Sequence, residues 1–516
     1  MQTDKLDNGI YATDYAYNIR NWLTGIEGGK FSQSLHYTDG LGVPCYNGNI
    51  SSMTWKSGAG ATPRGYKFSY DRLGRLTDAE YGEGPSLSVN TNRFNEQVTG
   101  YDKMGNILGL KRYGQTSATG YDVIDDLSLS YAGNRLKKVA DRAGTSTFNN
   151  GFEFKDGIDL STEYEYDENG NLTKDLNKNI TAIQYNCLNL PSRVMFANGN
   201  SISYLYDAAG RKLRTVHVLE GDSVTTDYCG NVVYENGVPQ ILLTEVGYVS
   251  LTDGQYHYYL KDHQGNNRVV VDEEGTVEEV NDYYAFGGLM STSSRQSVQP
   301  YKYNGKELDR KGGLDWYDYG ARHYDSVLGR WNGVEPSCEK HYSWSPYVYC
   351  KNNPVLRIDP DGKDDYVINY HGQLQLMRRT NRIVDVLYAS GTSGTVSKIN
   401  PEWKNIKVFD KSILPALETN LGNNTSGADY FAETSSAYDA ANIATFGIEN
   451  TGVEWKYTAG YRDGEKKYII GNSSRDYSVS TLEGINNNPF EGFQPIVDIH
   501  SHPSTQGASE HDMLNA

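Results

Sequence analysis

The end of the chain carries the residues whose types and spacing are best suited to chemistry. His500 and His502 stand at positions i and i+2, and Ser509 and Asp512 follow one loop later. Alternate residues of a strand point the same way, so the two imidazoles can face one ion. Two imidazoles and one carboxylate leave the fourth position of a tetrahedral zinc ion for water, which is the arrangement of a catalytic zinc. The pattern predicts a Zn²⁺ site with His500, His502 and Asp512 as ligands.

A hydrolytic zinc site also needs a general base and a group that orients the reacting carbonyl. Ser509 is suited to orient a tetrahedral intermediate by hydrogen bonding. Glu454 lies on a candidate strand of alternating character, residues 451–457, where apolar neighbours favour proton transfer near neutral pH. Glu449 and Glu465 are alternative bases. The zinc would acidify its bound water and polarise the scissile carbonyl.

This constellation resembles the JAMM/MPN (JAB-like) metallopeptidases, whose motif is a Glu on an early strand, then H-x-H-P, then S-x-x-D. Glu454, the run from His500 to Pro503 and the run from Ser509 to Asp512 follow in that order. The resemblance implies hydrolysis of peptide or isopeptide bonds, often in ubiquitin-like linkages. In that family a helix and further strands follow the last motif, so we expect the C-terminal domain to be incomplete at Ala516.

The composition indicates a mainly β protein. The 516 residues include 42 Tyr and 54 Gly but only 13 Phe and 7 Met, and Tyr favours strands while Gly favours turns. The net charge of -17 argues against nucleic-acid binding by the bulk of the chain, because phosphate contacts need a positive field. The five cysteines are far apart and odd in number, so they indicate neither a disulfide framework nor a cysteine zinc site. No apolar stretch reaches the roughly 18 residues of a spanning helix.

One short motif recurs from about residue 10 to residue 290. It has the form Tyr-Asp-x-x-Gly-Asn/Arg, and its copies begin at Tyr70, Tyr101, Tyr166 and Tyr206, with a worn copy at Tyr131 and Tyr185-Asn186 as a variant. From Tyr166 to Tyr185 is 19 residues (185 − 166), and a period near 20 indicates a repeat architecture. We predict one hairpin per copy, with Gly at positive φ in the turn and strands such as 162–166 and 201–206 beside it. Successive hairpins must pair edge to edge into a long sheet.

This motif resembles the YD repeats of Rhs proteins, which are related to teneurins and to the toxin-complex C subunits. Residues 15–23 and 259–266 look like further variants of it. The resemblance implies a hollow β-shell that encloses a C-terminal cargo. The repeat region is short for a full shell, so we expect the chain to be the C-terminal piece of a larger protein.

Residues 301–362 differ in character, because aromatic residues, Arg and Asp alternate densely there. One interpretation is a packed end-cap whose arginines pair with aspartates. The segment also resembles, nearly end to end, the Rhs-associated core domain, which closes the shell and marks the border of the cargo.

Some members of that family cut themselves near a terminal Asp-Pro-x-Gly, which here is residues 359–362. The candidates are Asp325 and Asp359, assisted by Arg322 or Arg330, because two nearby carboxylates can share a proton. The chain departs from the family at two places. Glu335-Pro336 replaces the usual Asp-Pro, and Lys363 stands where self-cleaving members tend to have Leu.

We therefore predict three parts. Residues 1–300 form a YD-repeat β-hairpin shell or spiral sheet, residues 301–362 form a core plug, and residues 363–516 form a variable α+β domain. Within that domain we predict strands at 365–370 and 468–470 and a helix near 428–445.

The leading functional hypothesis is a bacterial Rhs-type polymorphic toxin whose shell carries a zinc-dependent (iso)peptidase. It implies a peptide or ubiquitin-like substrate, an immunity protein, a secretion apparatus and a secreted or cell-surface location without a visible signal peptide. The alternative is a YD-repeat adhesion protein with an inactive tail, since exposed tyrosines can stack on carbohydrate. A nuclease is a third hypothesis, which the acidic charge disfavours. We expect no nucleic-acid partner and no membrane span. Fold analogy alone does not establish any of these functions.

Overall fold

The structure is a computed structural model that describes most of the first 359 residues and parts of the remainder. The described residues are 2–6, 11–20, 22–58, 61–148, 152–294, 299–336, 338–340 and 342–359, followed by the later strands named below and residue 443. The chain divides into two compact units, Met1–Asp361 and Gly362–Ala516. Each unit is described by itself.

The first unit begins with an 11-stranded sheet in which every strand pairs antiparallel with the next one along the chain. Its strands are β1 (Gln2–Leu6), β2 (Tyr11–Tyr17), β3 (Leu23–Gly28), β4 (Phe31–His36), β5 (Ser52–Ser57), β6 (Arg64–Tyr70), β7 (Leu76–Glu83), β8 (Glu96–Tyr101), β9 (Ile107–Gln115), β10 (Tyr121–Ala132) and β11 (Arg135–Asp141).

A 13-stranded sheet with the same consecutive order follows. Its strands are β12 (Tyr164–Tyr166), β13 (Leu172–Asp175), β14 (Ile180–Tyr185), β15 (Pro191–Phe196), β16 (Ser201–Tyr206), β17 (Lys212–Leu219), β18 (Asp222–Cys229), β19 (Val232–Glu235), β20 (Val238–Leu243), β21 (Gly247–Ser250), β22 (Tyr256–Lys261), β23 (Asn267–Asp272) and β24 (Val277–Val280). The predicted repeat of hairpins, and with it the mainly β fold class, is confirmed.

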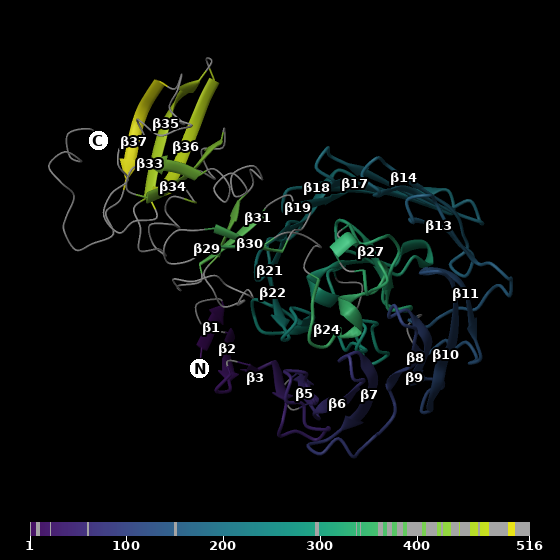
Figure 1. Cartoon of the computed structure of the whole chain (residues 1–516). Coiled ribbons are helices and arrows are strands. Elements are labelled where there is room, and N and C mark those ends of the chain that lie inside the picture. Colours follow the sequence, from purple (N-terminus) through teal and green to yellow (C-terminus); the bar gives the residue numbers. More distant parts are fainter. Residues whose placement is uncertain are drawn as a thin grey trace. The chain divides into compact units, whose positions relative to one another are not determined.

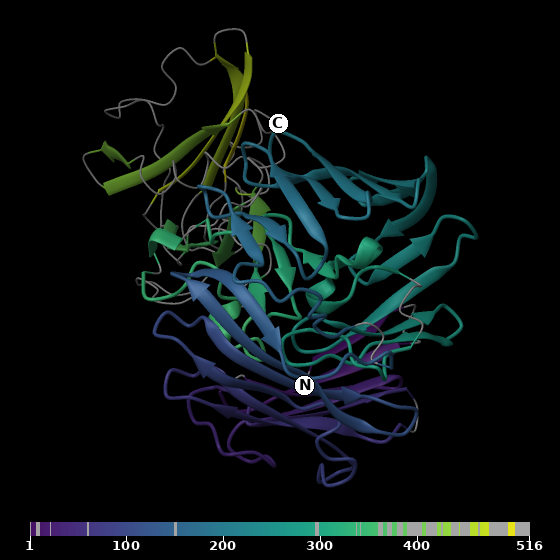
Figure 2. The same cartoon turned by 90° about the vertical axis from the view of Figure 1, so that its right-hand side faces the viewer.

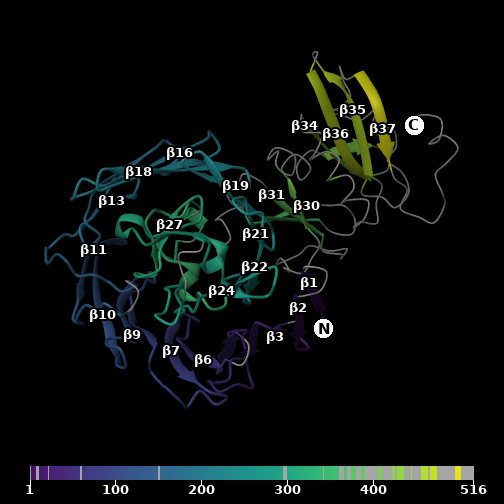
Figure 3. The same ribbon diagram turned by 180° about the vertical axis from the view of Figure 1, so that it is seen from behind.

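The two sheets form one curved wall around the last part of the first unit (Figure 1; seen from behind in Figure 3). Residues 299–359, here called the plug, lie inside this wall (Figure 2). The plug contains a small antiparallel sheet and several one-turn helices. These are β25 (Glu307–Asp309), β26 (Trp316–Asp318), β27 (His323–Asp325), β28 (Arg330–Trp331), η2 (Tyr303–Gly305), η3 (Lys311–Gly313), η4 (Cys338–Lys340) and η5 (Cys350–Asn352).

In the copies that carry it, the Asp closes its turn by accepting backbone hydrogen bonds. In the turn after β8, Asp102 Oδ1 accepts the N–H groups of Met104 and Asn106, both at 2.8 Å, and Oδ2 accepts the Asn106 side chain at 2.7 Å. Gly105 has φ +84°, which a residue with a Cβ adopts only at a cost. The spacing Asp-x-x-Gly-Asn therefore follows from turn geometry.

The Tyr of four of these turns binds the preceding repeat through its hydroxyl. Tyr101, the last residue of β8, donates its hydroxyl to the carbonyl of Leu76, the first residue of β7, at 2.5 Å. Tyr70, Tyr131 and Tyr185 make the same kind of bond to Ile50, Ile107 and Leu172 at 2.6–2.8 Å. Each of these tyrosines thus ties its own turn to a carbonyl at or just before the start of a strand in the repeat before it.

A buried glutamate joins the two sheets where the chain passes from one to the other. Glu163 is fully buried, and its carboxylate accepts the Val139 N–H of β11 at 3.0 Å and the Asn177 side chain at 2.9 Å. Its own N–H donates to Lys137 at 2.8 Å. The first sheet therefore continues into the second through side-chain as well as main-chain bonds.

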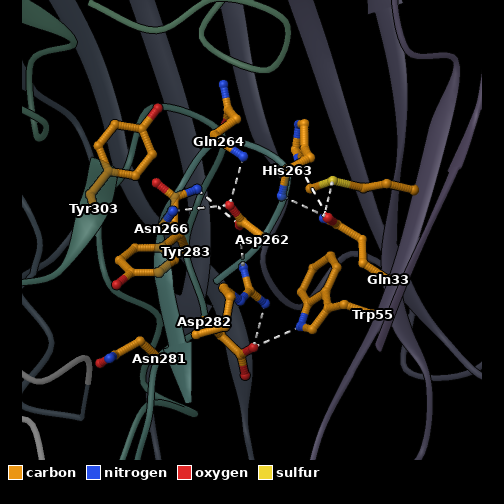
Figure 4. A network of polar contacts seen from close by, with 12 residues as sticks. Gln33, Trp55, Asp262, His263, Gln264, Asn266, Asn281, Asp282, Tyr283 and Tyr303 are labelled. Atoms are coloured by element: carbon orange, nitrogen blue, oxygen red, sulfur yellow. Dashed lines mark hydrogen bonds and ion pairs between the residues drawn. The ribbon is translucent and has the colours of Figure 1, made fainter. Parts of the chain in front are cut away.

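A second buried cluster joins the beginning of the wall to its end (Figure 4). Asp282, which is fully buried, accepts the indole N–H of Trp55 at 2.7 Å, a guanidinium N–H of Arg268 at 2.9 Å, and a further bond from Arg64. Arg268 and Arg64 hold the pKa of this carboxyl below its usual range, although burial alone would raise it. The carboxylate of Asp282 thus binds Trp55 and Arg64, which lie more than 200 positions earlier in the sequence.

The plug is attached to the turns along one rim of the wall. Asn353 donates to the carbonyl of Gly74 at 2.9 Å, Asn352 to that of Gly105 at 2.7 Å, and Tyr347 to that of Gly170 at 2.7 Å. The plug interior is aromatic, and its Tyr324 and Tyr349 rings stack with centroids 4.0 Å apart. The largest fully buried side chains of the unit include Trp55, Tyr66, Tyr81, Tyr284, Tyr303, Trp316, Tyr317, Tyr324 and Trp331.

The second unit contains two described sheets. The first has the order β30 (Leu374–Arg378), β29 (Asp365–Ile368), β31 (Asp385–Ala389) and β32 (Asn405–Val408). The second has the order β33 (Leu421–Asn424), β34 (Gly427–Thr434), β36 (Glu465–Ser473), β35 (Trp455–Arg462) and β37 (Gln494–His500). The helix predicted near 428–445 is wrong for its first turns, because residues 427–434 pair with β36 and with β33.

The tyrosine bond between repeats can be tested at Tyr101. We expect Tyr101→Phe to lower the free energy of unfolding by about 1 kcal/mol, because the substitution removes one half-buried hydrogen bond and leaves the Leu76 carbonyl without that donor. Urea denaturation followed by tryptophan fluorescence measures the change. Tyr46→Phe, at a side chain that is 73% exposed, is the matched control. Equal effects of the two substitutions would contradict a structural role for the tyrosine bond.

Candidate functional site

The predicted zinc site lies almost entirely outside the described residues. Glu454, His502, Ser509 and Asp512 are not among them, and His500 is described only as the last residue of β37. The backbone pairing of β37 with β35 sets His500 opposite Lys456. β37, which ends at the predicted ligand His500, is therefore paired with the beginning of β35. The predicted base Glu454 directly precedes β35 in the sequence.

The first carboxylate predicted for self-cleavage, Asp325, is buried at the end of β27. Its Oδ1 accepts the N–H groups of Val327 and Leu328 at 2.9 and 3.1 Å, and its Oδ2 accepts the Trp316 indole N–H at 3.1 Å. The ammonium of Lys178 lies 3.4 Å from Oδ2. Asp325 is thus a fully engaged anion beside a cation from the wall.

Asp325 lines a cavity of about 260 Å³ between the plug and the second sheet. Asp175 of β13 and Lys178 come from the wall, Asp315 comes from the plug, and Glu153 comes from the segment between the two sheets. None of these four residues could be recognised from the sequence, because none belongs to a motif with a chemical spacing.

Two carboxyls of this cavity are suited to proton exchange near neutral pH. Burial raises the pKa of Asp175 to about 7, although Lys178 lowers it, and the Asp325 charge raises it further. Burial also raises the pKa of Glu153 to about 7, against the hydrogen bond from the Ser146 N–H. Asp325 and Asp315 raise the pKa of Lys178 against the effect of its burial, so that its ammonium stays charged. The cavity therefore combines a fixed cation with carboxyls that can hold or release a proton.

The second predicted carboxylate, Asp359, lies with a different partner. It accepts a guanidinium N–H of Arg322 at 3.1 Å, and the same nitrogen lies 2.5 Å from Glu335. Arg322 also stands over the ring of Trp331, 4.1 Å from its centroid. The structure thus brings Arg322 and Asp359 together, and the predicted pairing of plug arginines with aspartates is present here.

Arg330 and Asp325, the other two residues predicted for self-cleavage, have contacts different from those of Arg322 and Asp359. Arg330 stands over the rings of Tyr131 and Tyr347 at 5.3 and 5.0 Å and donates to the Asn134 carbonyl at 3.3 Å. Asp325 and Asp359 have no hydrogen-bond partner in common among the contacts described for the plug. Their proposed joint action stays a prediction.

The described part of the chain contains no group of three or more His, Cys, Asp or Glu side chains placed to hold a metal ion. The predicted ligands lie elsewhere, so this finding does not bear on them. The same part of the chain contains no helix long and apolar enough to cross a membrane.

A curved wall of YD hairpins closed around an aromatic plug defines the class of YD-shell proteins. The family model for the teneurin YD-shell matches residues 45–355, which is 311 residues (355 − 45 + 1) and more than half of the chain. The chain belongs to this family. A second family model, for JAB-like toxin 1, matches residues 432–516. The resemblances indicated by the repeat motif and by the C-terminal motif are confirmed.

Several characterised proteins are similar to parts of the chain. Salivary gland surface protein 1 of Aedes aegypti is 30% identical over an alignment of 224 residues, and the match covers 38% of this chain and 6% of that protein. The tRNA3(Ser)-specific nuclease WapA of Bacillus spizizenii is 24% identical over 67% of this chain and 15% of its own length. Toxin subunit YenC2 of Yersinia entomophaga is 35% identical over 96 residues, 18% of this chain and 10% of that protein. The chain spans a small part of each of these relatives.

Among solved structures, that of TcdB2-TccC3-TEV is 14% identical, with a TM-score of 0.46, and the match covers 70% of this chain and 20% of that one.

The proton affinity of Asp175 can be tested through stability. Its pKa is higher in the folded protein than in the unfolded chain, so its contribution is complete below about pH 4 and is lost as the pH rises toward 7. We expect Asp175→Asn to unfold with a free energy about 2 kcal/mol higher than wild type at pH 8, and this gain should disappear near pH 4. Urea unfolding at both pH values measures it. Glu165→Gln, at an exposed position of β12, is the control, and a less stable Asp175→Asn protein at pH 8 would refute the assignment.

Self-cleavage is tested on a denaturing gel of the purified full chain. If Asp325 and Asp359 act together, the chain separates near residues 359–362, and either Asp325→Asn or Asp359→Asn keeps it whole. Asp315→Asn, at a carboxylate of the same cavity, should leave cleavage unchanged. Cleavage that continues in both variants would exclude the two aspartates as the acting pair.

Proposed function

We propose that the chain is the shell and effector part of a polymorphic toxin. In this proposal the YD wall and plug carry a C-terminal zinc-dependent hydrolase that cuts peptide or isopeptide bonds. Such a toxin would be secreted or displayed at the cell surface, and its producer would need an export apparatus and an immunity protein.

One observation carries this proposal. The JAB-like toxin match over residues 432–516 contains the predicted base Glu454 and the predicted ligands His500, His502 and Asp512. The antiparallel pairing of Lys456 with His500 supports it, because it holds the end of β37 beside the beginning of β35. A toxin subunit among the relatives, YenC2, agrees with the wider setting.

The donor set fits zinc, because neutral imidazole and carboxylate are common ligands of this ion. His500, His502 and Asp512 would hold it, and when bound it supplies an acidic water and a Lewis acid. Glu454 would accept the proton from the attacking water and pass it to the leaving amine. Ser509 would donate a hydrogen bond to the oxygen of the reacting carbonyl and so hold the substrate in place.

Two other functions remain as outcomes of the test. The WapA relatives are described as tRNA nucleases, which keeps nucleic acid as a substrate to assay, although the net charge of -17 disfavours it. An adhesion protein that binds carbohydrate and has an inactive tail would need no bound metal.

The zinc site is tested by metal analysis of the full chain purified with zinc available. We expect close to one zinc per chain in wild type, and its loss in His500→Ala, because two remaining ligands hold the ion poorly. Hydrolysis of a ubiquitin-like isopeptide substrate should fall by more than about 100-fold in the same variant and in Glu454→Gln. Glu454→Gln should retain the zinc.

The matched control is His36→Ala, which removes one imidazole at the end of β4 in the first unit. This variant should keep both zinc and activity. Equal zinc in His500→Ala and His36→Ala would reject the metal site. Cleavage of tRNA that survives His500→Ala, without peptide hydrolysis, would favour a nuclease instead.

A further inference from the structure

A buried lysine lies where the last strand of the wall meets the beginning of the plug. Lys302, near the start of the plug, donates to Glu279 Oε1 of β24 at 2.6 Å and to the backbone carbonyl of Gln299. Only 1% of Lys302 is exposed, and Glu279 is fully buried. The pair is therefore shielded from water, which would otherwise hydrate both charges.

The same carboxylate oxygen also holds the side-chain amide of Asn281, which directly follows β24. Asn281 Nδ2 donates to Glu279 Oε1 at 2.5 Å and to the Asn267 carbonyl at 3.1 Å. Figure 4 shows Asn281 beside Asp282, with its side chain directed away from the Asp282 cluster. Because one oxygen accepts from both nitrogens, Lys302 Nζ and Asn281 Nδ2 cannot be farther apart than these two bonds together. An amine, a carboxyl and an amide therefore meet at one atom.

Two oxygen atoms of this cluster have no hydrogen-bond partner among the described residues. They are Asn281 Oδ1 and Glu279 Oε2, and both are buried. A buried oxygen without a donor is unfavourable. If Glu279 is protonated, it becomes a donor, and a half-turn of the Asn281 amide places Oδ1 where Nδ2 now meets the carboxyl. The acid form of Glu279 would then polarise the amide carbonyl.

A second amide, that of Gln299, is close to the same carboxyl but is held differently. Its Nε2 donates to Glu279 Oε1 at 3.1 Å, while its Oε1 accepts the Tyr301 N–H at 2.6 Å and the Tyr259 hydroxyl at 3.2 Å. The Gln299 oxygen cannot turn toward Glu279 without losing these two bonds. Asn281 is therefore the better electrophile, because its oxygen has no such bond to lose.

The surroundings also favour the uncharged forms of the amine and the carboxyl. Burial raises the pKa of Glu279, although the charge and the hydrogen bond of Lys302 lower it. Burial lowers the pKa of Lys302, although the Glu279 charge raises it, and the Arg310 charge lowers it further. A proton moved from Lys302 to Glu279 leaves an amine, which is a nucleophile, and a carboxylic acid, which can act on an amide.

Lys212 shows the contrasting case of a lysine that is held as an ammonium ion. It lies 2.8 Å from Glu307 and 2.5 Å from Asp318. Although burial lowers the pKa of Lys212, the charges of Asp318 and Glu307 raise it well above its usual value. Lys302 differs because its described partners are one carboxylate and one uncharged carbonyl.

We propose that Lys302 and Asn281 form an intramolecular isopeptide bond, with Glu279 as the proton carrier. Glu279 first takes a proton from the ammonium, and the resulting amine attacks Asn281 Cγ. A new C–N bond forms and the bond from Cγ to the amide nitrogen breaks. Glu279 gives its proton to the leaving nitrogen, takes one from the attacking nitrogen, and passes it to the released ammonia, which departs as ammonium. The carboxylate is regenerated, and the balance needs no co-reactant.

The bond would attach the plug to the wall covalently. Asn281 directly follows the last wall strand and Lys302 belongs to the plug, so the link closes a loop of the chain from residue 281 to residue 302. Such a link restricts the unfolded chain as a disulfide does, and it also persists under reducing conditions. The plug would stay on the wall even if the chain were cut inside this loop. The inference is independent of the proposed zinc site.

The test is mass spectrometry of the purified full chain, before and after digestion with trypsin. Wild type should be lighter than its sequence by the mass of one ammonia molecule. Trypsin cuts after Lys and Arg, so Asn281 lies in peptide 269–295 and Lys302 lies in residues 296–306. The bond should join these two peptides and leave the chain uncut after Lys302. Lys302→Arg and Glu279→Gln should show the full mass and separate peptides.

Lys174→Arg is the matched control, because Lys174 also pairs with a glutamate, Glu165, at 2.8 Å, but at a more exposed site. This variant should keep both the loss of ammonia and the joined peptides. A link from Lys302 to Gln299 would lie within residues 296–306 and would overturn the assignment of Asn281.

Wild type alone decides the matter if a variant does not fold. A folded wild-type chain of full mass, with its two peptides separate, would overturn the isopeptide bond. A loss of ammonia that is still present in a folded Lys302→Arg chain would overturn it as well, because that loss would come from another site.

Discussion

The wall depends on two kinds of hydrogen bond, one made by the Asp and one by the Tyr of the YD motif. The Asp closes its own turn by accepting two or three hydrogen bonds, and the Tyr beside it donates to a carbonyl in the repeat before it. A single hairpin cannot bury an apolar face, so the repeats are stable only as a series. The Tyr bond supplies the link between neighbours at the turn end, where backbone pairing between strands stops.

Buried charged side chains connect the parts of the wall that the repeat bonds do not join. Asp282, Arg268 and Trp55 join the two ends of the wall, and Glu163 joins the two sheets. In the interior, Arg112 pairs with Asp125 at 2.7 Å and donates to the Val327 carbonyl of the plug at 2.7 Å. Breaking such a pair leaves an uncompensated buried charge, which is strongly destabilising, so these clusters fix one arrangement of wall and plug.

The local parts of the fold could be predicted and the distant ones could not. The strand expected at 201–206 is β16, residue for residue, and each YD copy has its glycine at positive φ where the spacing required it. The buried cluster around Asp282 was not predicted, because 227 positions separate Trp55 from Asp282 and no periodic signal relates them. Asp175 and Lys178 were missed for the same reason, since their importance comes from Asp325 of the plug.

The helix near residue 428 illustrates a conflict between local preference and pairing. A helix was predicted there from the sequence, but residues 427–434 pair with both β33 and β36, and this pairing decides the conformation. The predicted zinc residues could be named from spacing alone because H-x-H and S-x-x-D are local motifs. The geometry of these residues depends on contacts between distant parts of the chain, which a local motif does not specify.

The glycine carbonyls on the rim of the wall give the plug a further role. Gly74, Gly105 and Gly170 each accept a bond from a different plug residue, and neighbouring strands lie about 4.8 Å apart. Inserting or deleting one hairpin between them would move a turn by about two strand spacings, beyond the reach of its donor. The plug is therefore compatible with only one number of strands between these turns. Additional hairpins can be inserted only outside the part of the wall that these plug bonds connect. The number of repeats between Gly74 and Gly170 is therefore set by the plug.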